Sequence, residues 1–329
     1  MSPFPLRHEP AHSVLQHYAF IQPGDLLAPI GGGFSGARLW RLEGAGGTYC
    51  LKARPADPGR LIWIHALMNR ARVAGRTIVP QVVPTLEKST CITHAGLVWD
   101  LTTWMPGRAD FYHRPTTARL RAACTALAHL HTAWQSEAQW RAGPVPAIQR
   151  RRQRVQQWLA EIRTGWQPDF AAADPVRPWA ERAWHLLRGR IESMEASLAL
   201  HTAASGTNLQ PCLCDLWHDH VLFQEDQVTG LIDYDSVKLD HVAVDLARLL
   251  GSLAGDEGEL RRAGLQAYHE ARPAMPVDET LVDVLDRTGT LLALTNWLTW
   301  LYQDRRVFDD LQRVAGRLAV LVQRIDAWK

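Results

Sequence analysis

The sequence predicts an α+β protein whose first part is rich in β-strands and whose larger second part is mainly helical. Three observations lead to this fold class. Residues 37–42 alternate polar and apolar side chains, and a glycine turn separates them from a second predicted strand at 48–53, which is typical of paired strands. From about residue 107, apolar residues recur at the three- and four-residue spacing of amphipathic helices. Two short apolar runs, 221–223 and 231–232, flank the polar turn 224–227 and predict a β-hairpin with a four- or five-residue loop.

The elements of the first part follow from turns and periodicity. Pro58 suits the first turn of a helix whose apolar residues recur at helical spacing, with His65 on its inner face. In chain order we expect a short helix at 9–19, a glycine-rich turn at 29–36, strands at 37–42 and 48–53, a helix at 58–74, and strands at 79–83 and 97–103.

The second part reads as a series of helices. Thr116 or Thr117 is a suitable N-cap for the first of them, and Asp240 for the helix that follows the hairpin. We expect helices at 116–135, 147–164, 178–200, about 242–253, 257–271, 277–303 and 308–327.

Two aspartates mark the ends of the predicted hairpin. Asp215 lies just before the first strand, and Asp233 lies at the end of the second. A hairpin brings its outer ends together, so we expect the two carboxylates to face each other across a small gap. Because two carboxylates at short distance repel each other, we expect a cation or a proton between them. Mg²⁺ is the natural occupant, since it takes oxygen ligands and keeps several waters.

The residues around the hairpin resemble a known family. Asp215 is followed by four residues, His220 and then Val-Leu-Phe, and Ile-Asp233-Tyr comes after the turn. This pattern resembles the catalytic loop and metal-binding segment of aminoglycoside phosphotransferase-like small-molecule kinases. Residues 240–247 resemble the start of the family's next helix. The resemblance implies a bilobal protein kinase-like fold, with a small β-rich, nucleotide-binding N-lobe at 1–106 and a larger, mainly helical C-lobe at 107–329 that holds the catalytic and acceptor sites.

The resemblance implies roles for three of these residues. Asp215 would orient the acceptor hydroxyl and accept its proton, and Asp233 would be the main Mg²⁺ ligand. His220 stands at the second ligand position, where the family usually has Asn. Imidazole is a poorer ligand for Mg²⁺ than for Mn²⁺ or Zn²⁺, so His220 either ligates a different metal or only donates a hydrogen bond. Asp219 and Asp235 are further oxygen donors nearby.

A nucleotide site is implied in the N-lobe. Glycines let a backbone approach phosphates closely, although an ordinary hairpin turn has the same composition. Lys52 is one of four lysines in the chain, and in the family this lysine contacts the α- and β-phosphates of ATP; the alternative is an edge-strand lysine. The segment that starts at Thr103 resembles the hinge, where adenine hydrogen-bonds to the backbone. The expected nucleotide-binding residues are Gly31, Gly32, Gly33, Ser35, Lys52, Thr103 and Trp104.

Three departures from the family pattern keep a second interpretation open. Leu213 replaces the histidine that usually braces the catalytic loop, and His220 replaces Asn. The helix at 58–74 contains no acidic residue, so it cannot supply the glutamate that usually pairs with the strand lysine; His65 stands near that position. We therefore expect an ATP-dependent phosphotransferase acting on a small-molecule hydroxyl, with a catalytically impaired, nucleotide-binding pseudokinase as the alternative.

Composition limits the possible partners and the cellular compartment. The net charge of +2 favours neither nucleic acid nor a membrane surface as a partner, and no uncharged apolar run is long enough to span a bilayer. The five cysteines, together with an N-terminus that lacks an apolar run, indicate free thiols in a reducing, cytoplasmic compartment. A zinc site made of Cys212, Cys214, His218 and His220 is a third interpretation. Homoserine, choline and sugars remain open as acceptors, and the oligomeric state is undetermined.

Overall fold

A computed structural model describes residues 9–22, 24–31, 36–44, 46–170, 175–202 and 206–328. The chain forms two compact units, and each is described by itself. Unit 1 comprises residues up to 114 together with 132–134 and 219–237. Unit 2 comprises residues 115–131, 135–218 and 238–329.

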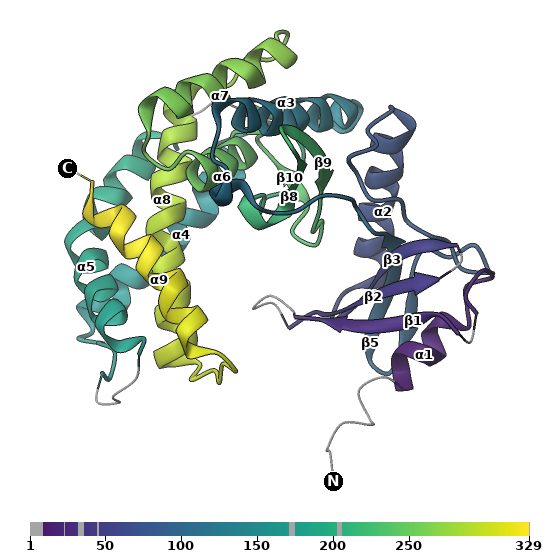
Figure 1. Cartoon of the computed structure of the whole chain (residues 1–329). Helices are drawn as coiled ribbons and strands as arrows, with labels where there is room; N and C mark the ends of the chain where they lie inside the picture. Colours follow the sequence, from purple (N-terminus) through teal and green to yellow (C-terminus); the bar gives the residue numbers. More distant parts are fainter. Residues whose placement is uncertain are drawn as a thin grey trace. The chain divides into compact units, whose positions relative to one another are not determined.

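Unit 1 is built on a five-stranded antiparallel sheet in the order β1-β2-β3-β5-β4, three of whose strands run side by side in Figure 1. One face buries an apolar core in which the rings of Trp40 and Trp99 stack with centroids 5.2 Å apart. The hairpin β8–β9 also belongs to this unit. Its elements are α1 (Glu9–Leu15), β1 (Leu26–Ile30), β2 (Arg38–Gly44), β3 (Gly47–Arg54), α2 (Pro58–Val73), β4 (Ile92–His94), β5 (Leu97–Thr103), the 3₁₀ turn η1 (Phe111–His113), β8 (Val221–Gln224) and β9 (Gln227–Leu231).

Helix α2 begins where its sequence predicts. Pro58 occupies the first turn, and the Asp57 carboxylate accepts hydrogen bonds from the N–H groups of Gly59 and Arg60 at 3.3 and 3.1 Å. These two bonds satisfy donors that have no partner inside the helix. The apolar side of α2 is buried and includes His65, which is 2% exposed.

Two predictions for unit 1 are wrong. Residues 79–83 form only an isolated bridge between Val82 and Thr102, because Pro80 and Pro84 lack the N–H groups that a strand needs. The first helix ends at Leu15 rather than Ala19, since the following N–H groups of His17 and Tyr18 bond three residues back and tighten into turns.

Unit 2 is mainly helical, with a small sheet in the order β10-β7-β6. Helix α8 is central and packs against α4, α5, α6 and α9. Within the described residues, no helix combines the length and apolar character needed to cross a membrane. The elements are α3 (Thr117–Ala133), η2 (Gln135–Glu137), β6 (Gln139–Ala142), α4 (Pro146–Arg163), α5 (Arg177–Leu200), β7 (Gly206–Cys212), η3 (His218–His220), β10 (Lys238–Asp240), α6 (Ala243–Leu253), α7 (Gly258–Ala271), α8 (Glu279–Leu298), η4 (Thr299–Gln303) and α9 (Leu311–Asp326).

The caps of unit 2 confirm one prediction and correct another. Thr116 accepts the N–H of Arg119 at 3.2 Å and caps α3. Asp240 does not cap α6, whose N-cap is Val242. Asp240 instead ends β10, is fully buried, and accepts hydrogen bonds from the N–H of Ala147 and from Arg150. The predicted helix at 277–303 is α8, followed by the separate π-helical turn η4.

Candidate functional site

The hairpin that the sequence predicts is present, but its loop is shorter than expected. Strand pairing runs from Val221 opposite Leu231 to Gln224 opposite Gln227, so only residues 225 and 226 form the turn. At the open end, the N–H of Ile232 donates to the carbonyl of His220 at 3.0 Å. The hairpin therefore places His220 and Asp233 next to each other.

His220 and Asp233 meet through their side chains. His220 Nε2 lies 3.5 Å from Asp233 Oδ2. Asp233 has a φ of +63°, a left-handed backbone conformation that side-chain-bearing residues seldom adopt and that is often found at functional sites. The two residues expected to ligate a metal are thus brought together, although their metal-binding role stays a prediction.

Lys52 lies on the other side of Asp233. Its Nζ is 2.8 Å from Asp233 Oδ1 and also 2.8 Å from Asp235 Oδ2. The Lys52 side chain is 15% exposed, so it is neither a solvated surface lysine nor fully enclosed. The alternative of an edge-strand lysine is wrong, because β3 lies between β2 and β5 in the sheet.

Asp235 also contacts a cluster of buried charged residues. Arg54 Nε lies 3.0 Å from Asp235 Oδ1, and Arg54 also pairs with Asp100 at 2.6 Å. His65 Nε2 from α2 contacts the other oxygen of Asp100 at 3.0 Å. Lys52 and Arg54 are two residues apart on β3 and project to the same face, while Asp100 is the cross-strand neighbour of Lys52 on β5.

The charges in this cluster fix the protonation of its carboxylates. Burial acts to raise the pKa of Asp233, but the positive charge of Lys52 and the neighbouring His220 outweigh it, so the pKa lies below its usual value. Burial of Asp100 is likewise outweighed by Arg54 and His65, and its pKa lies well below normal. Asp233 therefore remains anionic at neutral pH and available to a cation.

The remaining nucleotide-binding predictions have mixed outcomes. Gly32, Gly33 and Ser35 lie outside the described residues. Gly31 is exposed, and a Cβ added there would meet no atom of the described residues within 4 Å. The N–H of Thr103 donates to Gln81 and that of Trp104 to Thr48, each at 2.9 Å. A purine could therefore meet Thr103 and Trp104 only through other atoms, and their role as a hinge stays a prediction.

In unit 2, Asp215 lies on an exposed part of the loop that follows β7. Its carboxylate is 47% exposed and pairs with Arg248 Nε at 3.2 Å. The ring of Trp217 stands beside it, with the guanidinium groups of Arg248 and Arg317 at 5.6 and 4.1 Å from the ring centre. Asp215 and Asp233 belong to different units, so their convergence on one cation stays a prediction.

The loop that carries Asp215 is anchored by Asp245. This buried carboxylate accepts the N–H groups of Leu213 and Cys214 at 2.7 and 2.5 Å, and His131 Nε2 lies 3.0 Å from it. The anchoring uses the backbone of residue 213 rather than its side chain. Leu213, buried at 1% exposure, thus leaves this part of the loop's support intact despite the absent histidine.

Potential metal ligands also gather in unit 2. Within the described part of the chain, His131, Cys212 and Asp245 are the one group of three such residues close together. Each already has partners, and burial raises the pKa of the Cys212 thiol well above normal, which disfavours the thiolate that zinc requires. Cys212, Cys214 and His218 form no such group among the described residues, and His218 instead hydrogen-bonds to Ser252.

A profile of the phosphotransferase enzyme family matches residues 27–277, which is most of the chain. The chain belongs to this family. It is a phosphotransferase that acts on a small-molecule hydroxyl, and the resemblance seen in the hairpin motif is confirmed.

Relatives with curated names are homoserine kinases. The chain is 26% identical to one from Acidiphilium cryptum over 76% of its own length and 73% of that enzyme. It is 27% identical to one from Rhodopseudomonas palustris over 68% of its length and 63% of that enzyme.

Solved structures confirm the kinase-like fold. The family member matches spectinomycin phosphotransferase, determined with ADP and spectinomycin, with a TM-score of 0.71, 13% identity and 96% of each chain covered. It matches a microcompartment-associated aminopropanol kinase with a TM-score of 0.63, 14% identity, and 96% and 94% of the two chains covered.

Arg54 and Asp100 were not among the predicted site residues. The sequence does contain a signal for both residues: Arg54 follows Lys52 at the two-residue spacing of one strand face, and Asp100 is the one charged residue of the predicted strand 97–103. Pairing the two strands in register would have placed them together.

Proposed function

We propose that this phosphotransferase moves the γ-phosphate of ATP to the hydroxyl of a small amino alcohol. The observation that carries the proposal is the cluster of Lys52, Asp233 and His220, in which a lysine and a carboxylate are held 2.8 Å apart next to a second metal-ligand candidate. Phosphoryl transfer needs mainly positioning and charge neutralisation, and these groups supply both.

The residues of unit 1 fit a divalent cation bound with nucleotide. Asp233 is anionic, and its Oδ2 lies 3.5 Å from His220 Nε2. A carboxylate oxygen suits Mg²⁺, and an imidazole beside it makes Mn²⁺ an acceptable substitute. The bound ion would neutralise charge on the phosphates. Lys52 would exchange part of its pairing with Asp233 for phosphate oxygens while Asp235 continues to hold it.

Asp215 is the proposed base. Its carboxylate is exposed enough to meet an acceptor hydroxyl, and Asp245 fixes the backbone from which it projects. As the hydroxyl oxygen forms a bond to the γ-phosphorus and the bond from that phosphorus to the β–γ bridging oxygen breaks, ADP leaves and Asp215 accepts the hydroxyl proton. Arg248, whose Nε lies 3.2 Å from Asp215 Oδ1, orients the carboxylate.

The acceptor class is drawn from the names of relatives. Homoserine and aminopropanol both carry an amine and a hydroxyl on a short chain, and this shared chemistry defines the proposed substrate. Homoserine is the first compound to test, followed by aminopropanol and spectinomycin.

The decisive experiment measures ADP release with each acceptor, together with the shift in thermal unfolding caused by ATP and Mg²⁺ or Mn²⁺. At 100 times its Kd, a ligand stabilises by about 2.7 kcal/mol. We expect a metal-dependent shift in the wild type and none in Asp233→Asn. Asp226→Asn is a matched control, because Asp226 lies on the turn of the same hairpin and is 45% exposed.

The pseudokinase alternative gives a different result. A protein that only binds nucleotide would show the metal-dependent shift without ADP release above background for any acceptor. No shift with any nucleotide or metal would refute both readings of the site.

A further inference from the structure

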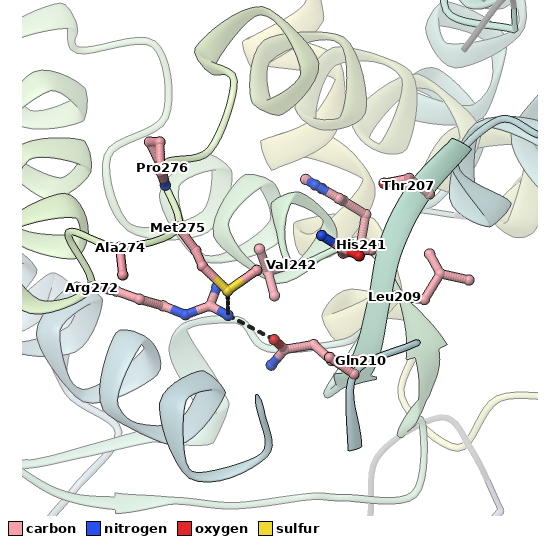
Figure 2. A pocket seen from close by; sticks show the side chains of 11 residues that line it. Thr207, Leu209, Gln210, His241, Val242, Arg272, Ala274, Met275 and Pro276 are labelled. Atoms are coloured by element: carbon pink, nitrogen blue, oxygen red, sulfur yellow. Dashed lines mark hydrogen bonds between the residues drawn. The ribbon is translucent and has the colours of Figure 1, made fainter. Parts of the chain in front are cut away.

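Unit 2 contains a pocket of about 350 Å³ that no step of the proposed reaction uses. Strand β7 forms one wall, and the segment that follows α7 forms the other. Figure 2 shows Arg272, Met275 and Pro276 facing His241, Thr207 and Leu209 across it. Its volume is within the range of small-molecule sites.

Arg272 is a buried cation in this pocket without an acidic partner. Its side chain is 4% exposed, and its guanidinium donates to three neutral groups: Gln210 Oε1 at 2.7 Å, Tyr268 Oη at 3.2 Å and Met275 Sδ at 3.3 Å. Its Nε has no hydrogen-bond partner. Among the described residues, no carboxylate pairs with it. A buried charge normally requires such a partner, because neutral dipoles compensate lost hydration only in part.

The opposite wall adds a neutral donor. His241 Nδ1 accepts the N–H of Ala243 at 3.2 Å, and burial keeps the pKa of His241 below normal. The neutral ring therefore carries its proton on Nε2, as a donor. Asn208 and Thr207 line the same pocket, while Val242, Leu209 and Pro276 contribute apolar surface.

We propose that this pocket binds a small organic carboxylate, with Arg272 as its ionic anchor and His241 as a second donor. One guanidinium with neutral donors matches the single charge of a carboxylate and its two oxygens. A phosphate dianion would need more positive charge than the wall provides. The apolar residues would contact the hydrocarbon part of the ligand.

The pocket is connected to the catalytic loop by hydrogen bonds within unit 2. Arg272 donates to Tyr268 Oη, Tyr268 Oη lies 2.8 Å from His131 Nδ1, and His131 Nε2 lies 3.0 Å from Asp245. Burial keeps the pKa of His131 below normal, so the neutral ring accepts from Tyr268 and donates to Asp245. Asp245 accepts the N–H groups of Leu213 and Cys214, so hydrogen bonds join Arg272 to the backbone of the loop that carries Asp215.

The test is ligand-observed NMR of acetate, propionate and succinate with the full-length protein, using propionamide and inorganic phosphate as comparison probes. Ala274 lines the pocket and is exposed, so Ala274→Trp fills the space without removing an Arg272 hydrogen bond. Ala160→Trp on an exposed face of α4 is the matched control. Binding is measured up to about 10 mM, a range suited to one ionic contact.

We expect saturable binding of at least one carboxylate to the wild type and to Ala160→Trp, weakened at least about 10-fold in Ala274→Trp, which is a loss of about 1.4 kcal/mol. Arg272→Gln should weaken it similarly if that variant folds. Equal binding of propionamide, tighter binding of phosphate, unchanged binding by Ala274→Trp or no binding of any carboxylate would each overturn the proposal. None of these readouts depends on kinase activity.

Discussion

Lys52 Nζ and Asp235 Oδ2 lie 2.8 Å apart, and the far oxygen of Asp235 is held by Arg54. A lysine that contacts phosphates needs a carboxylate that keeps it in place, and helix α2 contains no acidic residue to provide one. Asp235, two residues after Asp233, supplies this carboxylate from the segment after the hairpin. The absence of a helix glutamate is therefore compensated within unit 1.

Asp235→Asn should weaken the use of ATP. Without the second charge, Lys52 pairs with Asp233 alone and competes with the cation for that carboxylate. We expect kcat/KM for ATP to fall roughly 10- to 100-fold, because small misplacements of a catalytic charge are costly. Asp235→Glu should recover part of the loss. The measurement is steady-state kinetics with varied ATP and metal, and Glu225→Gln on the hairpin turn is the control. Equal kinetics for Asp235→Asn and the wild type would contradict this assignment.

Asp215→Asn should remove activity and leave stability unchanged. General-base assistance contributes roughly 10²- to 10⁴-fold, so kcat should fall by that factor while KM for the acceptor stays similar. The Asp215–Arg248 pair is about half exposed, and such pairs stabilise a protein by at most about 1 kcal/mol. Turnover and thermal unfolding are measured on the same samples. A variant with normal turnover would exclude Asp215 as the base.

Asp100→Asn should destabilise the protein in a pH-dependent way. The change leaves the buried guanidinium of Arg54 without its main partner, at a cost of about 3 kcal/mol near neutral pH. The pKa of Asp100 is lowered in the folded state, so its contribution is complete above the ordinary value of 3.8 and is lost as the pH falls toward the folded-state pKa.

The measurement for Asp100 is urea unfolding of wild type and variant from pH 7 to pH 3. The difference in unfolding free energy should shrink below about pH 3.8, because the unfolded wild type then takes up a proton on Asp100 that the folded state does not bind. Asp226→Asn, on the hairpin turn with its side chain 45% exposed and paired with Arg114, is the comparison and should show a smaller effect at neutral pH. A difference that grows on acidification would have the wrong sign.

Asp245→Asn should loosen the catalytic loop. The fully buried carboxylate accepts hydrogen bonds from two backbone N–H groups and faces His131, and an amide can accept on one side only. One unsatisfied buried donor costs about 1–3 kcal/mol, which should appear as a lower urea midpoint together with reduced turnover. Asp283→Asn on α8, 59% exposed, is the control. Turnover that is unaffected despite lower stability would show that Asp245 supports the fold but not the loop.

The local sequence around the hairpin was enough to predict that it exists. Short apolar runs on both sides of a polar turn specify a hairpin, and residues at its open end must be neighbours, which is why His220 and Asp233 meet. The predicted loop was too long, because Gln224 and Gln227 pair with each other and extend the hairpin's hydrogen-bonded strands, although neither residue is apolar. Main-chain pairing needs no particular side chain there.

The sequence by itself determined the family, the strand-rich and helical parts, and most helix bounds, since periodicity and capping residues act over a few neighbouring positions. Tertiary structure decided which charges are partners. Arg54, Asp100 and His65 come from two strands and a helix, and only the sheet register and the packing of α2 bring them behind Asp235. Asp240 shows the same dependence: its sequence context suggests a helix cap, but burial against α4 gives it other donors. A buried charge loses its hydration and therefore needs an oppositely charged partner. Which residue becomes that partner depends on which side chains the fold brings close together, and local sequence does not contain this information.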